Sequence, residues 1–181
     1  MKTRGNFVIF ICALLSACTT PPQPPLGLAK EVDIPRFMGD WYVIANIPTF
    51  IEKGATNAIE SYRLNDDGTI ATTFTFHEGQ PTGPLKRYDP KGFVEDQADH
   101  AVWRMQFMWP FKSDYRIVYL SPDYQETIIG REARDYVWIM ARSPTIPEDH
   151  YQRLTERLKQ EGYDVKKIEK VPQVWSPTKG P

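Results

Sequence analysis

The sequence predicts an all-β protein: an eight-stranded antiparallel up-and-down barrel with one C-terminal α-helix packed outside. Short segments with period-2 alternation, bounded by turn residues, recur from residue 41 to residue 142. No helical pattern of about ten residues separates them, which argues against a parallel sheet with helical crossovers. One amphipathic helix follows and needs a sheet to cover its apolar stripe. Closure into a barrel removes the exposed edges of that sheet.

Eight strands account for the alternating segments. They are expected at residues 41–47, 57–64, 69–76, either 85–88 or 92–96, 102–108, 114–120, 126–130 and 136–142. The second and third are joined by Asn65-Asp66-Asp67-Gly68, a hairpin signal because glycine tolerates a positive φ. The fourth strand has two candidate positions because neither segment defines it well.

The helix is expected to follow Thr145-Ile146-Pro147-Glu148, which resembles a capping box with proline near the first turn. Pro147, Tyr151, Leu154 and Leu158 form one apolar stripe. Gly162 is expected to end the helix.

Composition excludes several classes of function. The 181 residues carry a formal net charge of -1, which gives no basic excess for binding nucleic acid. Two cysteines, Cys12 and Cys18, do not make a disulfide framework. The motifs of nucleophilic, nucleotide-binding and zinc enzymes are absent from the sequence, so we expect no catalysis and no cofactor. His77, His100 and His150 are scattered and are expected at the surface, not as metal ligands.

Residues 1–17 are predicted to be a lipoprotein signal peptide. Lys2 and Arg4 precede an apolar run over residues 7–15 that is too short to span a bilayer. Leu15-Ser16-Ala17-Cys18 resembles the bacterial lipobox, which implies cleavage before Cys18 and attachment of lipid to it. The alternative is an ordinary signal peptide whose small residues happen to precede a cysteine. Thr19 is not aspartate, which by resemblance to lipoprotein sorting favours the outer membrane.

The mature chain is expected to have two parts. Residues 18–30 comprise the acylated cysteine and a proline-rich linker, in which residues 19–25 form a stiff spacer. Residues 31–181 form the barrel domain. Acyl chains on Cys18 make a durable membrane anchor.

Three short motifs resemble those of the lipocalins. Gly39-Asp40-Trp41 matches the G-x-W signature, and Ser121-Pro122-Asp123-Tyr124 resembles the T-D-x motif with serine for threonine and an inserted proline. Arg142 closes the last strand. Residues 135–146 look like the bacterial lipocalins and their apolipoprotein D-like relatives. The resemblance covers essentially the whole mature chain and implies a carrier of hydrophobic ligands.

Strand direction brings these motifs together. If successive strands alternate, then Gly39, Trp41, Asp123 and Arg142 meet at one end of the barrel. We expect this end to be closed and these residues to stabilise the fold, with Arg142 stacked on the Trp41 indole. The opposite end is then open and ringed by loops.

Eight strands enclose room for side chains or one small ligand. Counting by twos from Trp41 places Val43 and Ala45 inside. Similar alternation, together with the resemblance for the tyrosine of the second strand and the tryptophan of the last, predicts inward-facing side chains that bind ligand. These are Tyr62, Phe74, Phe76, Trp103, Phe107, Tyr115, Tyr119, Trp138 and Met140. The alternative for each is plain core packing.

The open rim carries cations and aromatic residues. Lys53, Lys86, Arg87 and Lys112 are candidates for contacting a phosphate or carboxylate head group, or are ordinary surface. Residues 108–111 lie at this rim, where they would admit ligand, touch the membrane or pack on a second subunit in a homodimer.

Three functions remain open. The first is a non-catalytic carrier of fatty acids or lysophospholipids at the outer membrane, with its domain facing the periplasm. The second is a haem or pigment binder, for which His77 is the candidate axial ligand. The third is a structural or stress-response envelope protein with a filled barrel.

Overall fold

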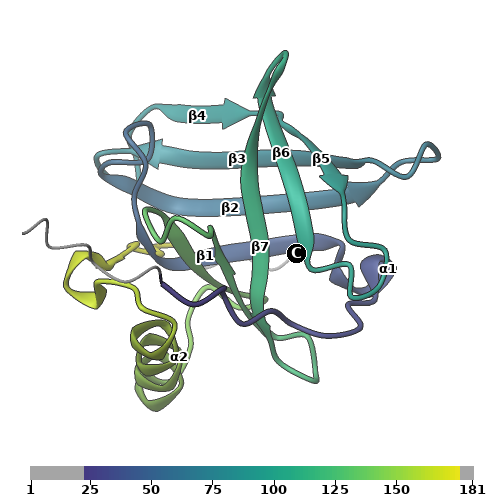
Figure 1. Ribbon diagram of the computed structural model, residues 1–181. Helices are drawn as coiled ribbons and strands as arrows, with labels where there is room; N and C mark the ends of the chain where they lie inside the picture. Colours follow the sequence, from purple (N-terminus) through teal and green to yellow (C-terminus); the bar gives the residue numbers. More distant parts are fainter. Residues whose placement is uncertain (1–22, 176–181) are drawn as a thin grey trace, which may run out of the picture.

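The computed structural model describes residues 23–175. Within this range the chain forms a closed antiparallel barrel with one long helix outside it, which confirms the predicted fold class (Figure 1). The strands are β1 (Gly39–Ile47), β2 (Ala55–Leu64), β3 (Ile70–Glu78), β4 (Leu85–Tyr88), β5 (Lys91–Val94), β6 (Val102–Met108), β7 (Phe111–Leu120), β8 (Glu126–Gly130), β9 (Val137–Ala141) and the short β10 (Glu169–Lys170). Pairing of β9 with both β8 and β1 closes the sheet.

The predicted strands 85–88, 102–108 and 126–130 are confirmed at both ends, and the other bounds differ by up to three residues. The two candidates for the fourth strand are both strands. β4 and β5 each pair with β3 and together occupy one place in an eight-stranded barrel. They are interrupted at Asp89 and Pro90, since proline has no N–H for a strand ladder. The predicted hairpin between β2 and β3 turns at Gly68, whose φ is +77°.

One end of the barrel is plugged by a short helix, α1 (Ile34–Phe37), which the sequence analysis missed. The Phe37 side chain is 0% exposed. Its ring centroid lies 5.1 Å from that of Trp41, 5.5 Å from that of Trp103 and 5.7 Å from that of Tyr62. The carbonyl of Phe37 also accepts a hydrogen bond of 2.9 Å from the Trp41 indole. These contacts fix α1 as the floor of the barrel.

The lipocalin-like motifs lie at this closed end. The Arg142 guanidinium stacks 3.8 Å from the centre of the Trp41 ring, as predicted. A Cβ on Gly39, whose φ is +93°, would lie 3.3 Å from Nη1 of Arg142, so glycine suits both the conformation and the space. Asp123 accepts a 2.6 Å hydrogen bond from Ser121 in the turn between β7 and β8. Two residues later in that turn, the backbone carbonyl of Gln125 accepts a hydrogen bond from the N–H of Arg142.

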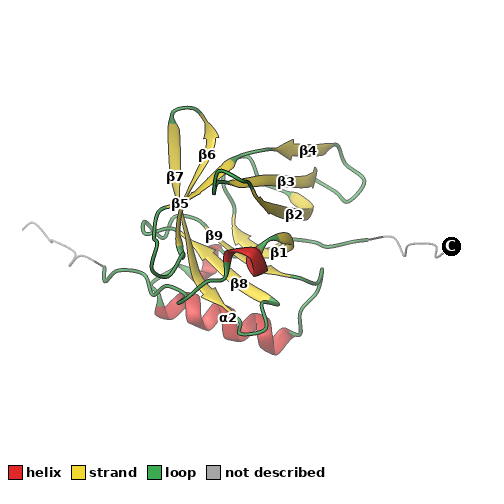
Figure 2. Cartoon of the chain, turned by 90° about the vertical axis from the view of Figure 1, so that its right-hand side faces the viewer, coloured by secondary structure: helices red, strands yellow, loops and turns green. Residues whose placement is uncertain are grey.

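Helix α2 (Glu148–Gln160) covers the outer face of the barrel beside β8 and β9 (Figure 2). Leu154 and Leu158 are buried there, as the apolar stripe predicts. The expected capping box is wrong. The N-cap is Pro147, which has no side-chain acceptor, and Thr145 lies two residues ahead of it.

Two residues predicted to face inward lie on the outer face instead. Ala45 and Tyr119 belong to the apolar cluster between the barrel and α2, where Arg157 lies 4.7 Å from the centre of the Tyr119 ring. The cause is a register shift in each strand, between Val43 and Ala45 in β1 and between Ile117 and Tyr119 in β7. An irregularity of this kind reverses the alternation beyond it.

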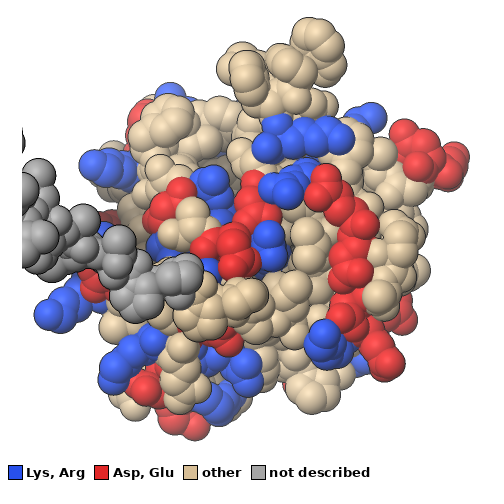
Figure 3. All heavy atoms as spheres, in the orientation of Figure 1, with Lys and Arg blue, Asp and Glu red and all other residues tan. Residues whose placement is uncertain are grey.

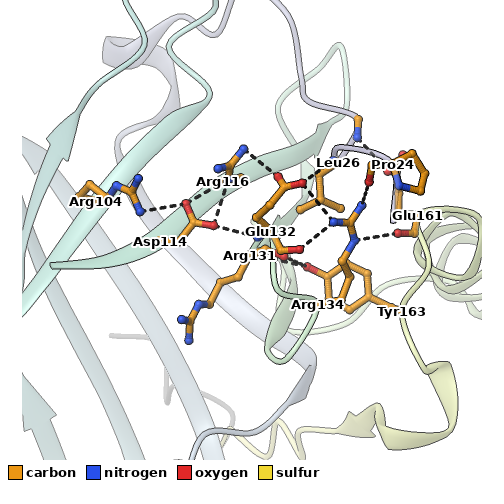
Figure 4. A network of polar contacts seen from close by, with 11 residues as sticks. Pro24, Leu26, Arg104, Asp114, Arg116, Arg131, Glu132, Arg134, Glu161 and Tyr163 are labelled. Atoms are coloured by element: carbon orange, nitrogen blue, oxygen red, sulfur yellow. Dashed lines mark hydrogen bonds and ion pairs between the residues drawn. The ribbon is translucent and has the colours of Figure 1, made fainter. Parts of the chain in front are cut away.

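The N-terminal segment is packed on the barrel from residue 24 onward. Leu26 is buried, and the N–H of Ala29 donates to the carbonyl of Ile117 at 2.9 Å. Arg134 donates to the carbonyl of Pro24 at 2.5 Å. Figure 4 shows this arginine at the centre of a polar network that joins the segment to Glu132 and Glu161.

The predicted signal peptide and Cys18 lie outside the described residues. Between residues 23 and 175, no helix combines the length and apolar character needed to cross a membrane.

Candidate functional site: a cavity at the open end of the barrel

A cavity of about 470 Å³ opens at the end of the barrel opposite α1. This volume falls in the range of small-molecule sites, about 300 to 1,000 Å³. Apolar and aromatic side chains form most of its wall, and a few polar groups interrupt them. The lining residues are Thr49, Phe50, Ile51, Glu52, Glu60, Thr72, Tyr88, Asp89, Pro90, Met105, Phe107, Ser113, Asp114, Tyr115, Arg131, Tyr136 and Trp138.

The mouth is formed by the β1–β2 loop, the β6–β7 hairpin and the β8–β9 loop, and the β4–β5 break lies lower in the wall. Figure 2 shows the β6–β7 hairpin standing apart from β4, whose described pairing is with β3. Tyr88 and Phe107 line the cavity on either side of this separation. The mouth therefore extends down the wall of the barrel between β4 and β6.

The tip of the β6–β7 hairpin is apolar and exposed. Trp109 is 82% exposed, and Met108 and Phe111 are also exposed. Figure 3 shows this tip as an uncharged knob above basic side chains, while the rest of that face mixes both signs of charge. Residues 108–111 thus lie at the rim, as predicted.

The predicted ligand-binding residues fall into three groups. Phe107, Tyr115 and Trp138 line the cavity. Five others are buried in the interior apolar cluster but are not among the lining residues: Tyr62, Phe74, Phe76, Trp103 and Met140. Tyr119 lies outside the barrel, as described above. The interior is therefore filled by side chains over part of its volume, including the floor against α1, and is hollow over the rest.

Stacked aromatic rings connect the floor to the wall. The ring centroids of Trp103 and Tyr115 are 5.8 Å apart, and those of Tyr115 and Trp138 are 6.4 Å apart, with interplanar angles of 25° and 26°. Rigid rings in this arrangement hold the Tyr115 hydroxyl inside the barrel.

A buried carboxyl group that was not predicted from the sequence, Glu60, lies in the middle of β2. Both the Tyr62 and the Tyr115 hydroxyls donate hydrogen bonds to its Oε2 atom, the latter at 3.3 Å. Burial, reinforced by the negative charge of Glu52, raises the pKa of Glu60 to about 8. Burial likewise raises the pKa of Tyr115 well above its ordinary value. At pH 7 the Glu60 carboxyl is therefore mainly protonated.

A second buried carboxyl, Glu52, comes from the β1–β2 loop. It accepts hydrogen bonds from the Trp138 indole at 3.2 Å, the Thr49 N–H at 3.1 Å and the Asn46 amide at 3.3 Å. Burial raises the pKa of Glu52, although these hydrogen bonds act in the opposite direction. The contact between Glu52 and Trp138 fastens the loop to the wall of the cavity.

Arg131 is the one basic residue among those that line the cavity, and the sequence analysis did not single it out. Its guanidinium points away from the neighbouring polar network (Figure 4). Its Nη1 is 3.3 Å from Oδ2 of Asp135, whereas its Nε is buried and has no hydrogen-bond partner among the described residues. The rim cations proposed from the sequence lie elsewhere: Lys86 pairs with Glu78, Arg87 pairs with Asp89, and Lys112 lies over the Phe93 ring.

His77 does not line the cavity. It follows the inward-facing Phe76 on β3 and therefore lies on the outer face, where its Nδ1 is 2.8 Å from the carbonyl oxygen of Gly83. In the described range, no group of three or more histidine, cysteine, aspartate or glutamate residues is arranged to hold a metal ion.

Comparison with known proteins adds independent information. The family described as "Lipocalin-like domain" matches residues 32–173. Temperature-induced lipocalin-1 of Arabidopsis thaliana is 34% identical over 164 residues, which cover 84% of this chain and 85% of that protein. The outer membrane lipoprotein Blc of Escherichia coli K12 is 29% identical over 157 residues, covering 86% of this chain and 88% of that protein. Insecticyanin from Manduca sexta has a similar structure, with a TM-score of 0.65 at 15% identity over 85% of this chain and 86% of that one.

Proposed function

Because the chain belongs to the lipocalin family, whose members generally bind small hydrophobic ligands, we propose that it binds and carries a fatty acid or a lysophospholipid without catalysing a reaction. The observation that carries this proposal is the cavity, which has a volume of about 470 Å³ and a largely apolar wall. A sixteen-carbon chain buried at about 0.8 kcal/mol per methylene contributes roughly 12 kcal/mol. At the low end of the association costs, about 4 kcal/mol, roughly 8 kcal/mol remains, which corresponds to a micromolar affinity.

Arg131 supports an anionic head group at the mouth. Arg131 lines the cavity, its Nη1 is 3.3 Å from Oδ2 of Asp135, and its buried Nε has no partner among the described residues. A phosphate or carboxylate at this position would supply the missing acceptor while the acyl chain lies below it. Charge-assisted hydrogen bonds of this kind are stronger than hydrogen bonds between neutral groups.

We propose that the protein acts at the bacterial cell envelope, anchored to the outer membrane through lipid on Cys18. The lipobox-like residues 15–18 support this, as does the similarity to Blc, which is an outer membrane lipoprotein. In this proposal residues 1–17 are removed and the barrel faces the periplasm.

Neither alternative function gains support from the cavity. A haem iron inside the barrel would need an axial ligand on the inner face, and His77 lies on the outer face. A barrel without a carrier role was expected to be filled, and this one is hollow near its mouth.

The proposal is tested by isothermal titration of the purified protein with palmitate and with a palmitoyl lysophospholipid. Both ligands are expected to bind with one site per chain. Phe107→Ser should lower both affinities because Phe107 lines the cavity, whereas Met108→Ser, its exposed neighbour outside the lining, should not. Arg131→Gln should weaken binding of both anionic ligands. Absence of heat and of saturation with either ligand would reject the proposal.

A further inference from the structure

The inner end of the cavity is polar, which an ordinary acyl chain does not need. Three side chains from three strands lie there: Glu60 of β2, Thr72 of β3 and Tyr115 of β7. They are 7%, 3% and 5% exposed, so they are shielded from bulk water by the barrel. Buried polar groups in proteins are nearly always hydrogen-bonded. The hydrogen bonds that these groups do not make within the protein therefore indicate which ligand groups the cavity can bind.

Part of the hydrogen-bonding capacity is already used. The Tyr62 and Tyr115 hydroxyls contact each other and both contact Oε2 of Glu60. In residues 23–175, no hydrogen bond is directed to the other carboxyl oxygen, Oε1. The carboxyl therefore has a free oxygen beside the cavity.

Thr72 has an unused hydroxyl at the same level. Its Oγ1 is fully buried and has no hydrogen-bond partner in the described chain. Strand register pairs Tyr62 with Thr72 and Glu60 with Phe74, so Thr72 and Glu60 are diagonal neighbours on the inner face. Diagonal neighbours of this kind are about 7 to 8 Å apart between their Cα atoms, so one small group can reach both side chains.

The protonation state of Glu60 determines which group fits. Since burial raises its pKa to about 8, the carboxyl is mainly neutral at pH 7 and can both donate and accept. A threonine hydroxyl can do the same. A ligand carboxylate would be costly because its charge would be buried there, and a methyl group would leave both side chains unpaired. A ligand hydroxyl is complementary to both.

Resting on the proposed function, we propose that this cavity prefers elongated apolar ligands that carry a hydroxyl group on the end that enters first. The hydroxyl would bond with Glu60 and with Oγ1 of Thr72, while the opposite, anionic end would remain near Arg131. An acyl chain hydroxylated at its terminal carbon belongs to this class. A site that hydrogen-bonds a ligand hydroxyl discriminates against the analogue without it, because its own polar groups are then left unpaired.

The experiment compares 16-hydroxyhexadecanoic acid with hexadecanoic acid by isothermal titration at pH 7. The wild-type protein is expected to bind the hydroxy acid about tenfold more tightly, opposite to the order of their hydrophobicities. Thr72→Val keeps the size of the side chain and removes its hydroxyl, so it should reduce the preference to about threefold or less. Thr75→Val, on the outer face of the same strand, is the matched control and should keep the preference.

The outcomes separate the two proposals. If neither acid binds, the proposed function fails. If both bind but the wild type shows no preference for the hydroxy acid, the polar-end proposal is overturned and the carrier function stands. A preference that survives unchanged in Thr72→Val would also overturn it, because it would then arise elsewhere.

Discussion

Asn57 and Val174 are joined by two hydrogen bonds, although 117 residues separate them in the sequence. The Asn57 amide donates to the carbonyl of Val174 at 2.9 Å, and the N–H of Val174 donates to Oδ1 of Asn57 at 2.6 Å. The Asn57 side chain thus satisfies both the N–H and the carbonyl of Val174, as the backbone of a neighbouring strand would. Nearby, the Gln173 amide donates to the carbonyls of Val43 and Ala58. The C-terminal segment thereby bridges β1 and β2 where their own pairing has ended.

This arrangement predicts that Asn57 stabilises the fold in two separable ways. Asn57 has a φ of +51°, which asparagine tolerates better than most residues and glycine tolerates freely. Asn57→Gly should lose about 1 to 2 kcal/mol of unfolding free energy through the lost hydrogen bonds. Asn57→Ala should lose about 1 kcal/mol more, because alanine is strained at this φ. Urea denaturation measures both, and equal losses would show that the conformation contributes nothing.

The Arg142 guanidinium predicts a loss of stability on substitution with lysine. It donates to four backbone carbonyls around α1, those of Arg36, Phe37, Met38 and Asp40. A single ammonium cannot reproduce this fork or its stacking on Trp41. We expect Arg142→Lys to lower the free energy of unfolding by about 2 kcal/mol. Arg63→Lys, at an exposed position of β2, should change it by less than about 0.5 kcal/mol.

The floor of the barrel depends on Phe37. Truncation to alanine removes a ring that is 0% exposed and leaves a void against Trp41, Tyr62 and Trp103. Phe37→Ala should cost about 3 to 5 kcal/mol, measured as the free energy of unfolding in denaturant. Phe50→Ala, which truncates a ring that is 87% exposed, is the control and should have little effect on stability. Similar losses for both variants would contradict the role of α1 as a plug.

Glu60 predicts a pH dependence of stability. Its pKa is about 8 in the fold against an ordinary value of 4.5, so between these values the folded protein holds a proton that the unfolded chain has released. The contribution of Glu60 to the free energy of unfolding is therefore complete below about pH 4.5. It is lost as the pH rises toward about 8, at up to about 1 kcal/mol per pH unit. Glu60→Gln keeps the hydrogen bonds and cannot ionise. Its denaturation midpoint should fall less steeply from about pH 5 to pH 8, and parallel profiles would contradict the assignment.

The strands and the closed end were largely predictable because they depend on local alternation and on short motifs. Gly39, Trp41 and Arg142 lie together as strand direction requires. The plug was not predictable in the same way. Helix α1 has four residues, and its position depends on Phe37 finding the aromatic rings inside the barrel. A helix so short gives no periodic signal.

The candidate site was predicted only in part. Alternation fails beyond a register shift, and for this reason Tyr119 and Ala45 were assigned to the wrong face. Glu60 was within reach of the same reasoning, since it lies two residues before the inward-facing Tyr62. A charged residue in an apolar interior is unexpected, and only its two phenol partners make its position understandable. Glu52 and Arg131 lie in loops, whose course alternation does not determine.

The N-terminal segment enters the fold beside the mouth. Pro24 is held by Arg134, and Arg134 belongs to the same loop as Arg131 and Tyr136, which line the cavity. If Cys18 is acylated, the six residues from there to Pro24 can reach at most roughly 20 Å. The opening would then be tethered close to the membrane leaflet, and a ligand would pass between the bilayer and the barrel without crossing the aqueous phase.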